Sequence, residues 1–318
     1  MKTNLLSTLA RVSRTLLIAA LALITTGALK AQSGINFFDN SILGIDLGNA
    51  SGGSPLHVGS HRNWAIFALT GGVTITDPAP GGPFDVIGNI ALGGTGNLSM
   101  TASTAKASVY RTTITQTAPA PGSGFYTGTL TTDPTYVTTG VSNATSAASA
   151  ATAMPNTNLT VPMFTGALAG SIPTSISLTA AAAITGVAAT TYVLNLNDLI
   201  LSGASAALTL NGTSTTNYVI NVNRFMTLSG GSKIQLGAGG ITEANILYNV
   251  GQNKLTPSSP AGTQYDVTLS GASKVSGIIL ATTRNVKETG GSIVYGEVIA
   301  KGVSLSGASK VINPYVSP

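Results

Sequence analysis

The sequence contains no cysteine among its 318 residues. This absence excludes disulfide bonds, thiol catalysis and cysteine-ligated metal sites. The fold must therefore be held by burial of apolar side chains and by backbone hydrogen bonds.

Charged residues are also scarce, at 8% of the chain against roughly 25% in ordinary soluble domains. The hydrophobic fraction of 43% is high enough to exclude a disordered chain. Glycine is abundant, with 38 residues, and threonine is frequent in stretches such as TTITQT and GTLTTDPT. This composition favours strands and tight turns.

Long apolar runs are missing except near the N-terminus. Lys2, Arg11 and Arg14 surround or precede an apolar core at 16–24 that is too short to span a bilayer. Small residues follow as far as Ala31. The pattern predicts a signal peptide over 1–31 and one exported domain over 32–318, located outside the cell or at its surface; an uncleaved N-terminal anchor is the alternative.

Loss of the signal peptide would also remove most of the excess positive charge. Three or four of the 15 Lys and Arg residues would leave, and the remaining 11 or 12 face 10 Asp and Glu, for a net charge of +1 or +2. This balance gives no support for nucleic acid or an anionic membrane as a partner.

One six-residue phrase is repeated. LSGASK occurs at 269–274 and 305–310, with LSGASA at 201–206 and LSGGSK at 228–233. Each copy follows alternating apolar and hydroxyl residues, as in a strand with one buried face, and its glycine suits a turn. Repeats too small to have their own core predict a solenoid.

The spacing of the phrase predicts the length of a coil. The polar residue before the glycine falls at 202, 229, 270, 289 and 306. The last two steps indicate coils of 17 to 19 residues, the first a coil with an inserted loop, and the step of 41 two coils. We therefore expect an all-β, right-handed parallel β-helix whose best-defined coils lie at 190–313.

Equivalent residues of successive coils should stack in columns. Asn195, Asn221 and Asn249 are predicted to form an amide ladder; three unrelated surface asparagines are the alternative. A second column reads Ala206, Lys233, an unassigned residue, Lys274, Ile293 and Lys310. Because like charges facing each other are unfavourable, we expect Ile293 to separate two of these lysines.

The remaining segments supply a helix and two caps. VSNATSAASAATAM places Val141, Ala144, Ala148 and Ala151 on one face and ends before Pro155, which predicts one flanking helix around 141–154. Residues 32–60 and the C-terminal NPYVSP are expected to cover the two ends of the solenoid.

The segments YVLNLNDLILSG, YVINVNRFMTLSGGSKIQLGAGGITEANILYNV and LSGASKVSGIILA with GEVIAKGVSLSG resemble the choice-of-anchor A domain, a family of exported bacterial domains. The resemblance covers 190–313 well and implies no catalytic residues. Family members usually carry a C-terminal sorting signal, which the residues before Pro318 do not match, so we expect free secretion or retention by a partner. The ice-binding β-helix family shares much of this pattern of apolar, small and glycine residues, including a helix along the coils.

Few residues of the sequence are of types that could catalyse a reaction or bind a metal ion or a phosphate group. The ten carboxylates, among them Glu288 beside Lys287 and Arg284, form no acidic pair in a repeating register, which argues against a polysaccharide-active enzyme. His57 and His61 suggest no third metal ligand. The glycine-rich segments lack the lysine of a phosphate-binding loop. We therefore expect no enzyme activity, no cofactor and no metal.

The sequence favours a secreted structural or adhesive protein that contacts a surface polymer or further copies of itself, without a transmembrane segment after signal removal. The first alternative is an ice-binding protein, since threonine pairs in VTIT at 73–76 and TTIT at 112–115 and a column with Thr209 would order water. The second is a polysaccharide-active β-helix enzyme. The candidate contact residues are Lys233, Lys274, Lys310, Thr227 and Thr268.

Overall fold

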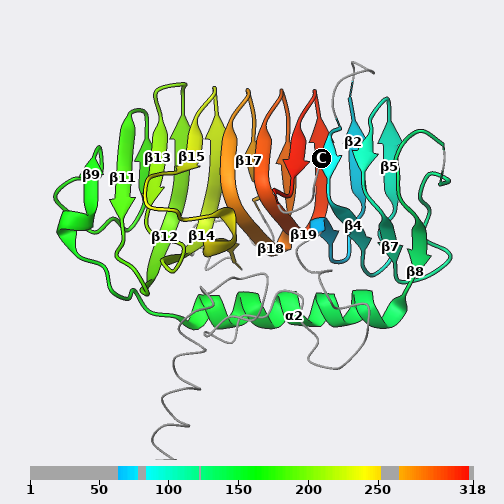
Figure 1. Cartoon of the computed structure of the whole chain (residues 1–318), viewed down its shortest axis with the longest axis horizontal. Coiled ribbons are helices and arrows are strands. Elements are labelled where there is room, and N and C mark those ends of the chain that lie inside the picture. Colours follow the sequence, from blue (N-terminus) through cyan, green and yellow to red (C-terminus); the bar gives the residue numbers. More distant parts are fainter. Residues whose placement is uncertain (1–63, 78–83, 122, 252–264, 315–318) are drawn as a thin grey trace, which may run out of the picture. The chain divides into compact units, whose positions relative to one another are not determined.

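The computed structural model describes residues 64–77, 84–121, 123–251 and 265–314. All of them belong to one compact unit, Ile35–Pro318. Short parallel strands wind around a common axis, and one long helix, α2 (Pro134–Ala153), runs beside them (Figure 1). This confirms the predicted parallel β-solenoid with a flanking helix. The predicted signal peptide, the domain boundary at 31/32, the cap at 32–60 and both histidines lie outside the described residues.

Each complete coil contributes to three sheet faces, which we name A, B and C. In one coil, β14 (Asn217–Ser229) supplies face A with 217–222 and face B with 225–229, and β15 (Lys233–Leu236) supplies face C. Long strands span several faces because the chain bends at the corners without leaving the ladder: β12 (Thr191–Ser202) covers A and B, and β18 (Lys274–Glu288) and β19 (Ile293–Ser306) cover C, A and B in turn.

The shorter strands each belong to one face. Face A contains β1 (Trp64–Ala68), β4 (Asn89–Leu92), β7 (Val109–Arg111), β8 (Leu130–Thr132) and β16 (Ile246–Val250). Face B contains β2 (Val73–Thr76), β5 (Leu98–Thr101), β10 (Ile176–Leu178) and β17 (Val267–Leu269). Face C contains β3 (Val86–Ile87), β6 (Ala105–Lys106), β11 (Ala181–Thr185), β13 (Ala207–Asn211) and β20 (Lys310–Ile312). Two single-turn 3₁₀ helices, η2 (Val161–Met163) and η3 (Glu243–Asn245), lie between strands.

The order of the coils along the axis differs from their order in the sequence. The last long strand, β19, pairs in parallel with β1 and β2, and β20 pairs with β3. The first described coil therefore stacks on the last one, and the chain leaves this junction through β4 to β8 and returns along α2 to the opposite end. Figure 1 shows the red coil with β19 beside the blue and cyan strands that include β2, within the row of coils.

Of the expected cap NPYVSP, only Asn313 and Pro314 are described, and they do not lie at an end of the solenoid. Asn313 lies at the junction, where its side-chain amide donates to the backbone carbonyl of Trp64. The strands at the two ends of the described stack are β8, which pairs with β7, and β9 (Phe164–Gly166), which pairs antiparallel with β11.

The predicted coil length is correct for the two shortest steps and wrong for the longest. Val275 lies one coil from Val294, a step of 19 residues, and Val294 one coil from Val311, a step of 17. The 41-residue step is a single coil, because Ile234 pairs directly with Val275. The length of the step suggested two coils because this one coil contains both η3 and the segment 252–264.

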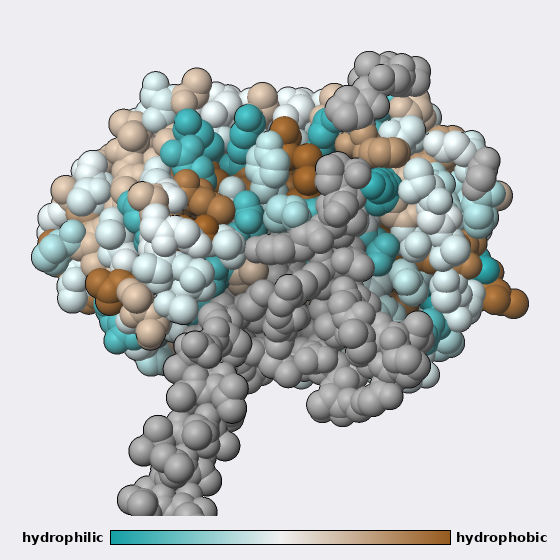
Figure 2. Space-filling view, in the orientation of Figure 1, coloured by the Kyte–Doolittle hydropathy of each residue, from teal (hydrophilic) through white to brown (hydrophobic). Residues whose placement is uncertain are grey.

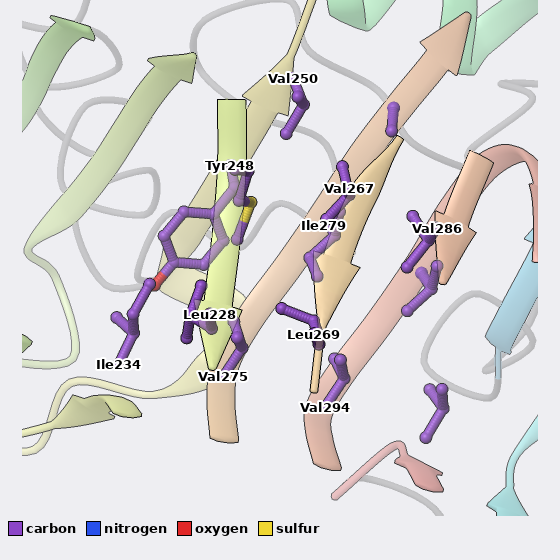
Figure 3. Packing of buried hydrophobic residues seen from close by; sticks show 14 of the residues in the cluster. Leu228, Ile234, Tyr248, Val250, Val267, Leu269, Val275, Ile279, Val286 and Val294 are labelled. Atoms are coloured by element: carbon purple, nitrogen blue, oxygen red, sulfur yellow. The ribbon is translucent and has the colours of Figure 1, made fainter. Parts of the chain in front are cut away.

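The interior consists of columns of aliphatic side chains. Figure 3 shows Leu228 and Leu269 from one column, and Ile234, Val275 and Val294 from another. Each of these side chains is fully buried. Since a buried aliphatic side chain contributes roughly 1.5–3 kcal/mol, stacking equivalent residues gives a chain without disulfides its main stabilisation.

The repeated phrase forms the corner between faces B and C. Gly271 and Ala272 have φ angles of 62° and 61°, and the equivalent Gly307 and Ala308 have 65° and 61°. Two successive left-handed residues reverse the chain, which explains the small residues at these positions. The serine that follows is buried, and its hydroxyl donates to a backbone carbonyl within the corner, as in Ser309 Oγ to the Ser306 carbonyl at 2.7 Å.

Helix α2 begins earlier than its predicted start at residue 141. Its N-cap is Asp133, whose side chain accepts a hydrogen bond of 2.9 Å from the amide of Tyr136, and Pro134 follows in the first turn. Asp followed by Pro is typical of a helix start, but the glycine and β-branched residues after it weaken the helical pattern of the sequence. The helix ends at Ala153, close to the predicted end.

The buried side of α2 is built from small residues. These are Val137, Gly140, Ala144, Ala147, Ala148 and Ala151. A Cβ atom added at Gly140 would lie 2.4 Å from Cε1 of Phe67, so the first turns can pack on face A only with glycine there. Trp64 lies against Phe67 and Tyr136, with ring centroids 5.6 and 5.5 Å apart respectively.

The predicted asparagine ladder exists and binds the helix. Asn221 Nδ2 donates to Asn195 Oδ1 at 2.7 Å, and Asn249 Nδ2 donates to Asn221 Oδ1 at 2.8 Å. The same amides donate to the carbonyls of Met154, Ala151 and Ala148 in that order, at 3.0, 2.7 and 3.1 Å. Three residues of helix rise about 4.5 Å, which is close to the roughly 4.8 Å between neighbouring strands. The asparagine of each successive coil therefore reaches a helix carbonyl three residues from the previous one.

Replacement of the central ladder residue, Asn221→Ala, should lower the free energy of unfolding by about 1–3 kcal/mol, because buried partners on both neighbouring asparagines and on Ala151 lose a hydrogen bond. Asn197→Ala, at an exposed position two residues beyond Asn195, is the control and should change stability by less than about 0.5 kcal/mol. Urea unfolding of the two variants measures the difference. Equal effects would mean that the ladder does not fix the helix.

Candidate functional site

Face B carries two rows of outward-facing side chains, two residues apart on each strand. In the first row, Thr227 pairs with Thr268, and Ser304 pairs with Thr74. The complete first row, in order along the axis, is Ser177, Ile200, Thr227, Thr268, Lys287, Ser304, Thr74 and Ser99. Six of these eight residues bear a hydroxyl group, so the row is a nearly continuous line of Ser and Thr.

The second row contains the serines of the repeated phrase. Ser202 pairs with Ser229, and Ser306 pairs with Thr76, which pairs with Thr101. Ser270 and Thr289 occupy the coils between them, where their amides donate to the carbonyls of Leu228 and Leu269. Every one of these seven residues has a hydroxyl group, and all are exposed or half-buried.

The two rows continue across the junction between the C-terminal and N-terminal coils. Ser304 and Ser306 belong to β19, whereas Thr74 and Thr76 belong to β2. A surface of one chemical kind is thus assembled from segments separated by about the whole described chain. The predicted outward threonines of 73–76 are confirmed, since Thr74 and Thr76 are exposed.

Two other predicted threonine positions are wrong. Residues 112–115 form a turn with Ile114 exposed, and not a strand of face B. Thr209 lies on face C, where it pairs with Gln235. The alternation of apolar and hydroxyl residues identified both segments, but alternation alone does not reveal which face a strand occupies.

The candidate residues from the sequence therefore fall on two faces. Thr227 and Thr268 are neighbours on face B. Lys233, Lys274 and Lys310 lie on face C, with Ile293 between the last two as predicted. No residue separates Lys233 from Lys274, and the residue paired with Lys233 on its other side is Ala207, not Ala206.

Among the described residues of the two rows, Lys287 is the one charged side chain, and it has an acidic partner. Lys287 Nζ lies 2.6 Å from Asp266 Oδ2, and Asp266 also accepts a hydrogen bond from Asn285. The hydroxyl rows therefore present little net charge. Figure 2 shows a long side of the molecule on which hydrophilic, neutral and apolar side chains are interspersed without one dominant patch.

Most of the described carboxylates have partners within the fold, and the buried side chains of Asp77 and Asp85 share a hydrogen bond. Asp133 caps α2, Asp198 is paired with Arg224 and Asp266 with Lys287. Within the described ranges there is no group of three or more His, Asp or Glu side chains that could hold a metal ion. A pocket of ≈ 400 Å³ lies between α2 and the corner at Thr282 and Thr283, and the described residues that line it include no ionisable side chain.

Glu288 points into the apolar interior. It occupies the column between Leu269 and Leu305, is fully buried, and neither carboxylate oxygen has a hydrogen-bond partner. Burial raises the pKa of Glu288 well above its ordinary value. Its sequence neighbours do not neutralise it, because Lys287 faces outward and the Arg284 guanidinium donates to the backbone carbonyls of Asn223 and Tyr265.

No known family model matches the sequence, so the resemblance to the choice-of-anchor A domain is not confirmed. No curated protein matches it either.

Solved structures with this fold do exist. They include an ice-binding protein (LeIBP) from an Arctic yeast, with 18% identity over 81% of this chain and 93% of that chain and a TM-score of 0.50. A Shewanella frigidimarina ice-binding protein has 16% identity over 79% and 94%, with a TM-score of 0.49. One from the Antarctic ascomycete Antarctomyces psychrotrophicus has 18% identity over 82% and 97%, with a TM-score of 0.47. At 18% identity, the likeness to the yeast protein describes the fold alone.

The buried carboxyl group makes a prediction about pH. Between the ordinary pKa of Glu288 and its raised folded value, the unfolded chain releases a proton that the folded chain retains, so stability falls as pH rises, by up to about 1.4 kcal/mol per unit. Glu288→Gln should be more stable than the native chain by about 1–3 kcal/mol at pH 7 and should lose this part of the slope.

Urea unfolding at several pH values from 4 to 8 measures both quantities. Glu297, which is also buried with a raised pKa, stays in both proteins and cancels in the comparison. An unchanged slope in Glu288→Gln would contradict the placement of this carboxyl group in the core.

Proposed function

We propose that this chain is a secreted ice-binding protein and that face B is its ice-binding surface. The observation that carries the proposal is the pair of hydroxyl rows, which run over successive coils and across the junction. This replaces the structural or adhesive role, which the sequence favoured, as the leading function.

The geometry of the rows suits an ordered layer of water. Residues of one row are separated by roughly 4.8 Å between strands, and the two rows by roughly 6.6 Å along each strand. Threonine presents a hydroxyl and a methyl group together, so it can hydrogen-bond to one water molecule and restrict its neighbours. A regular grid of such groups favours lattice-like water over the irregular hydration of an ordinary protein surface.

Rigidity of the face matters as much as its chemistry. Each contact with water is weak, and binding a crystal requires many contacts at once without the loss of conformational freedom that a mobile surface would incur. The parallel backbone ladder beneath face B and the buried columns behind it hold the hydroxyl groups in place before ice is met.

The solved structures with this fold are consistent with the proposal. The yeast and Shewanella frigidimarina proteins are described as ice-binding proteins, and the yeast protein is described as having antifreeze activity. A protein with this function acts where ice grows, and export by the predicted signal peptide over 1–31 would bring it there. No helix in the described part of the chain has the length and apolar character needed to cross a membrane.

The proposal predicts that bulky side chains on face B abolish ice binding. Thr268→Tyr combined with Ser304→Tyr should reduce thermal hysteresis and inhibition of ice recrystallisation several-fold, because two tyrosine rings lift the neighbouring hydroxyl groups away from the crystal plane. Thr209→Tyr, on face C, is the matched control and should retain the native activity. Both assays are made on the chain purified after signal removal.

The outcome that contradicts the proposal is also defined. A native chain that produces neither thermal hysteresis nor recrystallisation inhibition is not an ice-binding protein. Activity that survives the double substitution on face B, or is lost equally in the face C control, would assign ice binding to another surface.

A further inference from the structure

Face C contains two lysines that lie side by side. Lys233 begins β15 and Lys274 begins β18, and the two residues are direct partners in the parallel ladder. Lys274 is exposed and Lys233 half-buried. Neither ammonium group forms an ion pair with any residue that the structure describes.

The surroundings of this pair provide no negative charge. Along the same row, Ala207 precedes Lys233 and Ile293 follows Lys274. Two residues further along the strands lie Gln235 and Ser276. The corner that leads into each lysine consists of glycine, alanine and serine, so uncharged groups face the pair from every described element around it.

Lys310 shows the contrast. It lies two coils from Lys274, beyond Ile293. Its next neighbour along the axis is Asp85, and the charge of Lys310 opposes the effect of burial on that carboxyl group. Lys310 thus has an acidic neighbour within the fold, whereas the pair Lys233–Lys274 does not.

Two unscreened like charges in direct register are unfavourable. An anionic group placed between the two ammonium groups would remove this repulsion and form charge-assisted hydrogen bonds with both. The paired lysines are therefore a preformed site for carboxylate, sulfate or phosphate groups, and their spacing along the axis suits a ligand that is itself extended.

Neutral residues beside the lysines indicate which kind of polymer fits. Tyr295 lies on β19 two residues beyond Ile293, half-buried, and presents an aromatic ring of the type on which sugar rings pack. Gln235 Nε2 donates to Thr209 Oγ1 at 3.1 Å, which fixes an amide and a hydroxyl group beside Lys233. Gln235 lies two coils from Tyr295 on the same face, so amide and hydroxyl groups at one end of the lysine pair and an aromatic ring near the other could contact successive sugar units of a saccharide.

We propose that face C binds an acidic polysaccharide, with Lys233 and Lys274 holding its anionic groups and Tyr295 packing against a sugar ring. The polymer would run along the axis, because Lys233, Lys274 and Ile293 follow one another from coil to coil and Tyr295 lies beside Ile293 on β19. The site is separate from face B, so the inference does not depend on ice binding.

The test is binding of the full secreted chain to alginate, a polymer of uronic acids, measured by isothermal titration calorimetry at low and at physiological salt. The native chain should bind alginate, more weakly as salt increases, and should not bind neutral dextran. Lys233→Gln combined with Lys274→Gln should weaken binding about tenfold or more. Lys287→Gln combined with Lys301→Gln removes the same charge from other surfaces and should change affinity little.

Tyr295→Ala and inorganic polyphosphate separate a saccharide from other polyanions. Weaker alginate binding by Tyr295→Ala, with polyphosphate binding unaffected, supports the saccharide assignment; equal behaviour toward both polymers overturns it. The proposal also fails if the native chain does not bind alginate, or if both double variants lose affinity equally. Circular dichroism and unchanged thermal hysteresis of Lys233→Gln/Lys274→Gln would show that its fold and face B are intact.

Discussion

The parallel hydrogen-bond ladder between coils is the interaction on which the rest of this structure depends. It places equivalent residues of each coil directly above one another. A residue type that recurs at one position of the repeat therefore forms a row along the axis. Inside, the rows are aliphatic columns such as Leu228 and Leu269; outside, they are the hydroxyl rows of face B. Because β19 pairs with β1 and β2, the same ladder joins the two halves of the chain and keeps these rows continuous.

Helix α2 runs along the ladder and returns the chain from one end of the solenoid to the other. It carries the polypeptide from the β8 end back to the β9 end, and the near match between three helical residues and one coil lets Asn195, Asn221 and Asn249 each reach a helix carbonyl. Small residues bring the helix close enough for these bonds. Helix α2 thereby covers face A, whereas it does not cover faces B and C.

The sequence was most informative where one residue type recurs in one register. The repeated phrase predicted the solenoid, the line of Ser229, Ser270 and Ser306, and the position of Ile293 between two lysines. It could not reveal that the 41-residue step is one coil, since coil length does not distinguish an insertion from an extra turn. It also could not show that β19 meets β1, because pairing between distant segments depends on the path of the whole chain. For the same reason, the sequence could not show that Thr209 and Thr227 lie on different faces.

The two exposed faces differ in chemistry, and this division is central to the account. Face B is nearly uncharged and rich in hydroxyl groups, whereas face C has the paired lysines; both faces extend across the junction. The absence of cysteine allows a direct test of that junction. Partners in a parallel ladder lie roughly 4.8 Å apart, within the Cα range of about 4.4–6.8 Å for a disulfide. Ser304→Cys with Thr74→Cys should form an intramolecular disulfide under mild oxidation, whereas Ser304→Cys with Ser99→Cys, two coils apart, should not. Failure of the first pair, or equal oxidation of both, would contradict the stacking of the last coil on the first.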